Sequence, residues 1–209
     1  NLIKSNPMKD IKLLKDRKRI VETFDNQQIK ALFKACDLRT FVGLRDYTIM
    51  MLLLETGVRV NELVSIKTTD IIWEQKVIRI RNTKGGFERF VPIQDKMINQ
   101  LKKYIAVRGS VDTDYLFITR DDTPLSKKQV QDRIKEYGKK AGIKNVRCSP
   151  HTFRHTFAKL CVLNGANAFQ LQAILGHTSL EMTKVYVNLF SNEVQQGHAK
   201  FSPINRLFK

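Results

Sequence analysis

Apolar residues in this chain recur every three or four positions, with one interruption at residues 71–92. Such spacing places side chains on one face of an α-helix, whereas alternation places them on one face of a strand. Inside the interruption, apolar residues at 77–80 and 87–91 flank Gly85 and Gly86. Glycines at a turn between two apolar runs are typical of a β-hairpin. The sequence therefore predicts a mainly α protein with a small antiparallel β-hairpin sheet, an α+β class.

The helical pattern predicts one compact domain with an arm at each end. Asp25 and Ser126 are suited to cap helices, and Gly57 ends one. The segment 115–117 is expected to be isolated and extended. We expect helices near residues 25–36, 44–55, 58–66, 95–107, 126–142, 151–163, 168–175 and 180–189.

Composition limits the partners. The chain has 209 residues, 42% of them hydrophobic, and a net charge of +17. This hydrophobic content supports a folded core, and the charge favours nucleic acid, an anionic membrane surface or an acidic protein. The longest apolar run, 48–54, is far shorter than the ~18 residues of a membrane-spanning helix. We expect no membrane partner.

The cysteines and the N-terminus indicate where the chain functions. Cys36, Cys148 and Cys161 are odd in number, far apart and never in a C-x-x-C pair. This argues against a disulfide framework or a thiolate metal site, and we expect a reducing cytoplasm. The chain begins at Asn1, without a signal region, and is interpreted as a fragment of a longer protein.

Reactive side chains are densest around His151, Arg154 and His155. On a helix, His151 and Arg154 share a face and could meet one anion. His151 and His155 are also four apart, but Thr152 stands where a zinc peptidase helix carries its catalytic Glu, which disfavours a metal site. Taken alone, this cluster is also compatible with histidines that only cap or pack.

Four further positions are ambiguous in isolation. Arg59, just after a glycine turn, could be a surface charge, and Tyr186, between two valines, could be a core residue. Lys84 lies in the glycine-rich hairpin and His177 follows Gly176. Their order along the chain makes the combination specific.

With these motifs, the sequence resembles the tyrosine recombinase (phage-integrase) family of site-specific DNA recombinases. The resemblance covers roughly residues 24–189 and implies that family's catalytic-domain fold. It also implies a basic interdomain arm at 1–20, a catalytic domain at 21–190 and a C-terminal tail at 191–209, with the family's N-terminal core-binding domain absent. The matching segments are TGVRVNEL (56–63), TKGGFERFVP (83–92), HTFRHTFA (151–158) and LGH (175–177) through Tyr186.

The resemblance implies covalent catalysis. Tyr186 would attack the scissile phosphodiester to form a 3′-phosphotyrosine, with no metal ion, cofactor or ATP. Arg59 and Arg154 would bind the non-bridging oxygens. His151 would be the general base, Lys84 the general acid, and His177 would hydrogen-bond the phosphate, although Arg81 and Arg89 on the same hairpin could share phosphate contacts. Glu62 and His155 would support the site without acting in the chemistry.

The family's way of working implies the partners. Strands are exchanged through a Holliday junction by a homotetramer on two double-stranded DNA recombination sites, with room for an accessory directionality factor. The tail would dock in a neighbouring protomer. We expect DNA integration and excision of a mobile genetic element, in preference to resolution of chromosome dimers. A type IB topoisomerase-like enzyme and a non-catalytic DNA-binding regulator remain the alternatives.

Overall fold

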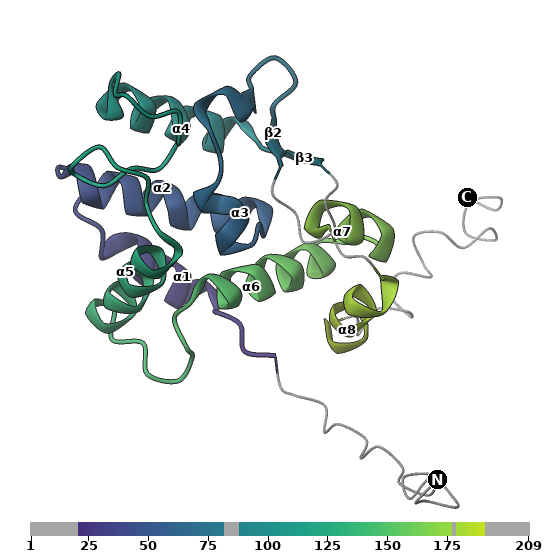
Figure 1. Cartoon of the computed structure of the whole chain (residues 1–209). Helices are drawn as coiled ribbons and strands as arrows, with labels where there is room; N and C mark the ends of the chain where they lie inside the picture. Colours follow the sequence, from purple (N-terminus) through teal and green to yellow (C-terminus); the bar gives the residue numbers. More distant parts are fainter. Residues whose placement is uncertain (1–20, 82–87, 177–178, 191–209) are drawn as a thin grey trace, which may run out of the picture.

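The computed structural model describes residues 21–81, 88–176 and 179–190 (Figure 1). These residues form a mainly helical domain with a small antiparallel sheet, which confirms the predicted fold class. The expected arm (1–20), hairpin turn (82–87) and tail (191–209) lie outside the described residues. Within the described part of the chain, no helix is long and apolar enough to cross a membrane.

The helices match the predicted periodicity, and their ends follow capping rules. The Asp25 carboxylate accepts a hydrogen bond from the Gln28 N–H over 2.7 Å, and the Ser126 hydroxyl accepts one from the Gln129 N–H over 3.2 Å, so both predicted caps are confirmed. The helices are α1 (Asn26–Lys34), α2 (Phe41–Thr56), α3 (Val60–Val64), α4 (Asp95–Arg108), α5 (Lys127–Lys140), α6 (Pro150–Leu163), α7 (Ala168–Leu175) and α8 (Leu180–Phe190), with a 3₁₀ turn at Thr68–Asp70.

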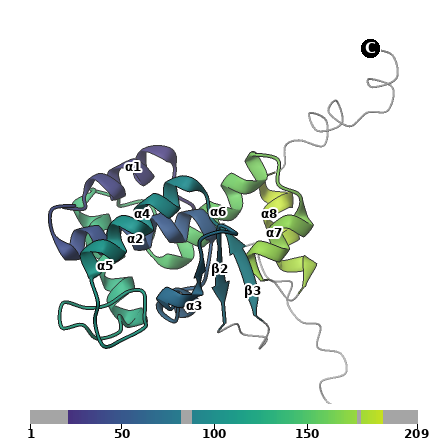
Figure 2. The ribbon, with the colours of Figure 1, turned by 90° about the horizontal axis from the view of Figure 1, so that it is seen from above.

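Helix α2 is the central element of the main core. It packs against α4, α5 and α6, as Figures 1 and 2 show. Its apolar residues point in several directions, as expected of a helix covered on most sides. Ile49, Met50, Leu52 and Leu53 are all at most 2% exposed. The C-terminal end of α2, where the candidate site begins, is therefore firmly held.

The sheet has three strands, β1 (Ile71–Ile72), β2 (Val77–Ile80) and β3 (Arg89–Pro92), in that order. Ile78 pairs with Val91 in the antiparallel register, and both are buried. The neighbouring Phe90 points outward and is 54% exposed. Strand β1 was not predicted separately, because two residues are too few to show a period.

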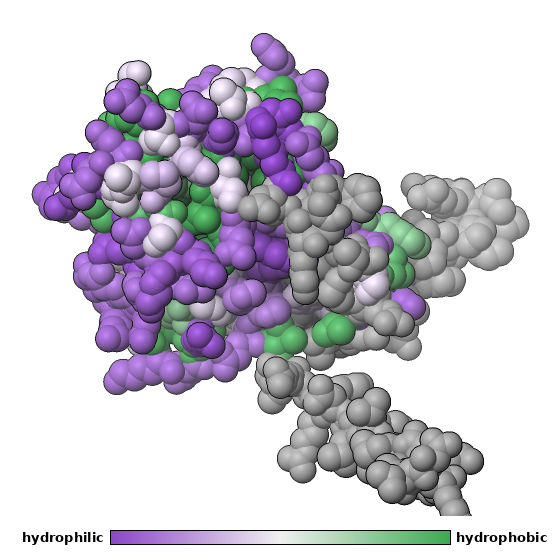
Figure 3. Space-filling model, viewed as in Figure 1, coloured by the Kyte–Doolittle hydropathy of each residue, from purple (hydrophilic) through white to green (hydrophobic). Residues whose placement is uncertain are grey.

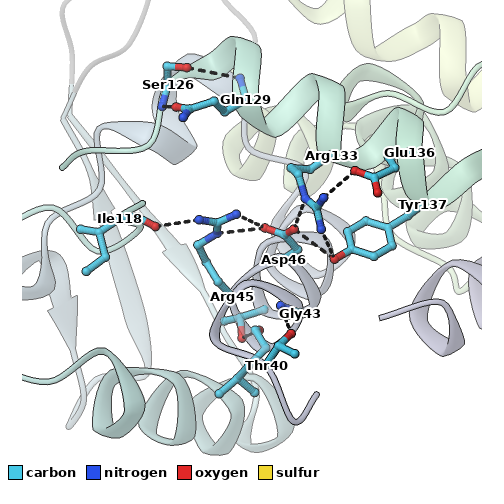
Figure 4. Close-up of polar contacts among 12 residues, drawn as sticks. Thr40, Gly43, Arg45, Asp46, Ile118, Ser126, Gln129, Arg133, Glu136 and Tyr137 are labelled. Carbon is cyan, nitrogen blue, oxygen red and sulfur yellow. Dashed lines mark hydrogen bonds and ion pairs between the residues drawn. The ribbon is translucent and has the colours of Figure 1, made fainter. Parts of the chain in front are cut away.

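A buried polar network joins α2 to α5 (Figure 4). The Asp46 carboxylate, 3% exposed, accepts hydrogen bonds from Arg45 and Arg133 and from the Tyr137 hydroxyl. Arg45 also donates to the carbonyl of Ile118 over 2.9 Å. Because the charge of Asp46 is paired and its oxygens are hydrogen-bonded, the network can lie in the core.

Helices α6, α7 and α8 enclose a second apolar cluster. In Figure 2 they lead away from α1 and α5, and α7 and α8 form the opposite end of the molecule. Tyr186, on α8, belongs to this cluster and is only 6% exposed. The other buried members are Phe157, Ala158, Val162, Leu171 and Leu175.

Candidate active site

The site begins where α2 ends and α3 starts. Gly57 caps α2 with φ of +60°, a left-handed conformation that favours glycine, and its N–H donates to the Leu53 carbonyl over 3.0 Å. A Cβ on Gly57 would come within 2.8 Å of Leu175 on α7 and would overlap the ring of Phe157 on α6. The turn thus lets three helices approach closely and places Arg59 at the start of α3.

The buried Glu62 side chain holds Arg59 at this junction. Its carboxylate accepts a hydrogen bond from the Arg59 backbone N–H over 2.8 Å and one from the Arg59 side chain over 2.9 Å. Arg89 donates to both carboxylate oxygens, over 2.9 and 2.8 Å. Burial raises the pKa of Glu62, but the hydrogen bonds from Arg89 and Arg59 outweigh it, so the pKa lies below its ordinary value. Glu62 is therefore an anion that orients Arg59.

Arg154 lies deeper, on α6, and is 6% exposed. Its guanidinium donates to the Gly57 carbonyl over 2.6 Å and to the Leu175 carbonyl over 3.0 Å. Burial lowers its pKa to about 10, and the positive charge of Arg59 acts in the same direction. Arg154 is still a cation at neutral pH. Arg59 donates to the adjacent carbonyl, that of Gly176, over 3.4 Å.

Tyr186 reaches the same region from α8. Its hydroxyl lies 2.7 Å from Nδ1 of His155, the residue after Arg154. Burial raises the pKa of Tyr186, although the charges of Arg154 and Arg59 pull it down. Burial lowers the pKa of His155, and His151 and Arg154 add to this effect. A neutral imidazole therefore faces a neutral phenol.

His151 occupies a different position, on the exposed first turn of α6. It lines a cavity of about 1010 Å³ together with His155 and residues of α5. Most charged side chains on its wall are basic: Lys128, Lys135, Lys139 and Arg147, against Glu22 and Asp132.

The structure therefore brings together most of the predicted site residues. Arg59 is paired with Glu62, Arg59 and Arg154 donate to the adjacent carbonyls of residues 176 and 175, and His155 contacts Tyr186. His151 is one helical turn from His155. Lys84 and His177 lie outside the described residues. In the described ranges, no group of three or more His, Cys, Asp or Glu side chains could hold a metal ion.

Arg89 was not recognised from the sequence as a partner of Glu62. It is tied by Glu62 and by the Ile174 carbonyl, to which it donates over 3.0 Å. Arg81 pairs with Asp70. The two-residue period of the strand indicates that Arg89 points inward, because residues 89 and 91 share a face and Val91 is buried.

The fold and this cationic, tyrosine-containing site define a tyrosine recombinase catalytic domain, and the chain belongs to the phage integrase family, whose model matches residues 22–193. The resemblance seen in the sequence is thus confirmed.

A relative named as a tyrosine recombinase supports this assignment. The chain is 39% identical over 186 residues to tyrosine recombinase XerA of Saccharolobus solfataricus, matching 89% of this chain and 58% of that protein. The chain thus spans little more than half of that relative.

Solved structures share the fold. A crystal structure of XerA recombinase superimposes with a TM-score of 0.73 at 30% identity, covering 87% of this chain and 66% of that one. The Tn1549 transposon integrase in complex with transposon right end DNA gives a TM-score of 0.72 at 23% identity, covering 98% and 72%. At this lower identity, the second match shows the fold alone.

Proposed function

We propose that the chain is the catalytic part of a site-specific DNA recombinase that cleaves and rejoins strands through a 3′-phosphotyrosine. The observation that carries the proposal is the convergence of one tyrosine hydroxyl, one imidazole and two guanidinium groups. Arg154 and Arg59 donate to the neighbouring carbonyls of residues 175 and 176, and the residue after Arg154 contacts Tyr186. A phosphodiester in this region would meet both cations and a nucleophile.

In the proposed reaction, the Tyr186 oxygen forms a bond to phosphorus and the bond from phosphorus to the 5′-oxygen breaks. Arg59 and Arg154 stabilise the added negative charge of the transition state. The phenol proton goes to His151, the general base that the family resemblance implies, which lies one helical turn from His155, the imidazole that contacts the hydroxyl in this structure. The leaving 5′-oxygen takes a proton from Lys84, and His177 hydrogen-bonds the phosphate. No ATP is needed, because the phosphoester bond is kept, and the two guanidinium groups take the charge-stabilising role that a metal ion would otherwise have.

The DNA-binding surface is proposed to include the basic cavity beside His151. Its lysines and Arg147, with the net charge of +17, suit a polyanionic duplex. Figure 3 shows one face of the molecule covered largely by hydrophilic residues. The Tn1549 integrase, whose structure contains transposon DNA, shares the fold. We expect binding to weaken steeply with added salt.

A covalent adduct tests the chemistry. Duplexes enriched from a random-sequence library by binding to this chain supply the probe, and a nick beside each candidate phosphate traps the cleaved product. We expect a protein–DNA adduct that survives denaturation with the wild type and is lost in Tyr186→Phe. Tyr47→Phe is the control, since Tyr47 packs against Phe33 on α1. An adduct of equal yield in Tyr186→Phe excludes Tyr186 as the nucleophile.

For the whole protein, we propose an N-terminal core-binding domain joined through the arm 1–20 to the catalytic domain 21–190. Four copies would act on two DNA sites through a Holliday junction, with the tail 191–209 docking in a neighbouring protomer. Deleting the residues after Asn192 should leave single-site binding nearly intact and weaken assembly on DNA, measured by light scattering of the complex. Unchanged assembly would refute a role for the tail.

The product of the reaction separates the competing functions. Exchange between two defined sites supports a recombinase, relaxation of a plasmid alone supports a type IB topoisomerase-like enzyme, and binding without any adduct supports a regulator. We further propose integration and excision of a mobile element in the cytoplasm, with an accessory directionality factor. The Tn1549 transposon integrase shares the fold, which is compatible with a role on a mobile element. Detection of excised circular DNA in cells expressing the whole protein tests it.

A further inference from the structure

The contact between His155 and Tyr186 links two helices that are distant in sequence. His155 projects from the middle of α6 and Tyr186 from α8, 31 residues later, and Nδ1 lies 2.7 Å from the hydroxyl. Their ring centroids are 5.7 Å apart at an interplanar angle of 43°. A distance of 2.7 Å is that of a well-formed hydrogen bond to a hydroxyl. The contact therefore specifies where the hydroxyl lies.

The surroundings make this hydrogen bond consequential. The Tyr186 ring packs in the apolar cluster of α6 and α7. Its hydroxyl oxygen is rigidly attached to that ring, so a hydrogen bond at the oxygen constrains the orientation of the whole side chain. A buried phenol hydroxyl needs a hydrogen-bonding partner. Burial raises the pKa of Tyr186 and lowers that of His155, so the contact is a hydrogen bond between a neutral phenol and a neutral imidazole.

We propose that His155 is a positioning residue for the nucleophile, holding the Tyr186 hydroxyl through its Nδ1 atom beside Arg154. This proposal rests on the recombinase function proposed above. His155 follows Arg154 in the sequence, so in this proposal one turn of α6 carries both the phosphate-binding cation and the residue that orients the nucleophile. Removal of the hydrogen bond should then slow the attack without changing DNA affinity, because a misplaced reactive group can cost about 100-fold in rate.

A DNA-free measurement tests the hydrogen bond itself. In protein labelled with ¹⁵N-histidine, we expect the Nδ1 resonance of His155 to shift when Tyr186 becomes Phe, which keeps the ring but removes the hydroxyl. Tyr47→Phe is the matched control and should leave that resonance in place. An unchanged His155 resonance in Tyr186→Phe overturns the proposal, whether or not the chain cleaves DNA.

Two substitutions at position 155 separate positioning from packing. Asn can place an amide close to the position of Nδ1, whereas Leu cannot hydrogen-bond. We expect His155→Leu to slow single-turnover cleavage of the nicked duplexes about 100-fold at unchanged Kd. His155→Asn should stay within about tenfold of the wild type. Equal rates in the two variants mean that His155 only packs, and faster cleavage by His155→Leu means that the contact restrains Tyr186; either result overturns the proposal.

Two further outcomes keep the test decisive. His155→Leu is checked for a cooperative unfolding transition, and if it does not fold, the resonance of His155 in Tyr186→Phe decides. Absence of any wild-type adduct refutes the proposed function but leaves the hydrogen-bond measurement valid. His151→Asn, one turn away, should leave the response of His155 to Tyr186→Phe intact even where it slows cleavage. If His151→Asn abolishes that response, the positioning role cannot be assigned to His155.

Discussion

Arg89 donates one hydrogen bond to each carboxylate oxygen of Glu62. Arg89, on β3, therefore orients Glu62, and Glu62 in turn orients Arg59. The same Arg89 side chain donates to the Ile174 carbonyl at the end of α7. One guanidinium therefore joins β3, α3 and α7, and β3 follows in sequence the segment that contains Lys84.

Replacing Arg89 by Met should destabilise the fold by about 3 kcal/mol, because it removes one partner of a buried ion pair. The Glu62 side chain is 1% exposed, so its carboxylate cannot recover the loss in water. Urea denaturation measures the free energy of unfolding. Arg39→Met is the control: Arg39 pairs with Asp37 at the surface and is 90% exposed. Equal effects of both changes would contradict a special role for Arg89.

The Glu62 carboxylate should make the free energy of unfolding decrease at acidic pH. Its pKa is lowered from 4.5 in the folded state, so the unfolded chain binds more protons as the pH falls through this range. Its stabilisation is present above pH 4.5 and is lost as the pH falls through the folded-state pKa. Measured by urea denaturation, the advantage of the wild type over Glu62→Gln should shrink as the pH falls below 4.5. A constant difference would show that the charge of Glu62 is irrelevant.

Arg154→Lys should reduce the single-turnover rate of cleavage by roughly 10² to 10³, with a small effect on DNA affinity. A lysine ammonium cannot reproduce the planar fork that reaches the carbonyls of Gly57 and Leu175. Arg120→Lys, at an exposed position, should cleave at the wild-type rate. Retention of full activity by Arg154→Lys would remove Arg154 from the proposed chemistry.

Gly57→Ala should destabilise the protein more than Gly142→Ala, by at least about 1 kcal/mol. The two glycines have similar φ angles, +60° and +70°, so both alanines carry left-handed backbone strain. Only at Gly57 would the Cβ meet other atoms, those of Phe157 and Leu175. Thermal unfolding of the two variants measures the difference, and similar losses would mean that the helices move apart easily.

The sequence was most informative where residues close together in the chain determine the local structure. The apolar period predicted every long helix, and the side chains of Asp25 and Ser126 predicted two helix starts, because these signals act within a few residues. The site depends on longer relationships. Arg59 and Tyr186 were found only through the order of motifs along the chain. Arg154 was noted from its spacing with His151, but nothing in these spacings shows which atoms meet.

The same limit explains what was missed. His155 was expected to support the site without acting in the chemistry, but its partner could not be read from the sequence, because the contact with Tyr186 arises only when α8 folds back on α6. Arg89 was considered as a phosphate ligand beside Lys84, but a charged residue on the inner face of a strand indicates a buried partner, and Glu62 is that partner. Packing, and not local pattern, selects between these roles.

The carbonyl partners of Arg154 hold its guanidinium in place without cancelling its charge. The nearby carboxylate of Glu62 is already shared between Arg59 and Arg89. The charge of Arg154 is therefore incompletely neutralised, which lowers the stability of the folded state. An anion that binds Arg154 shifts the unfolding equilibrium toward the native state. The thermal stability of the protein should therefore rise with the fraction of sites that hold phosphate, because Arg154 and Arg59 would bind it only in the folded state.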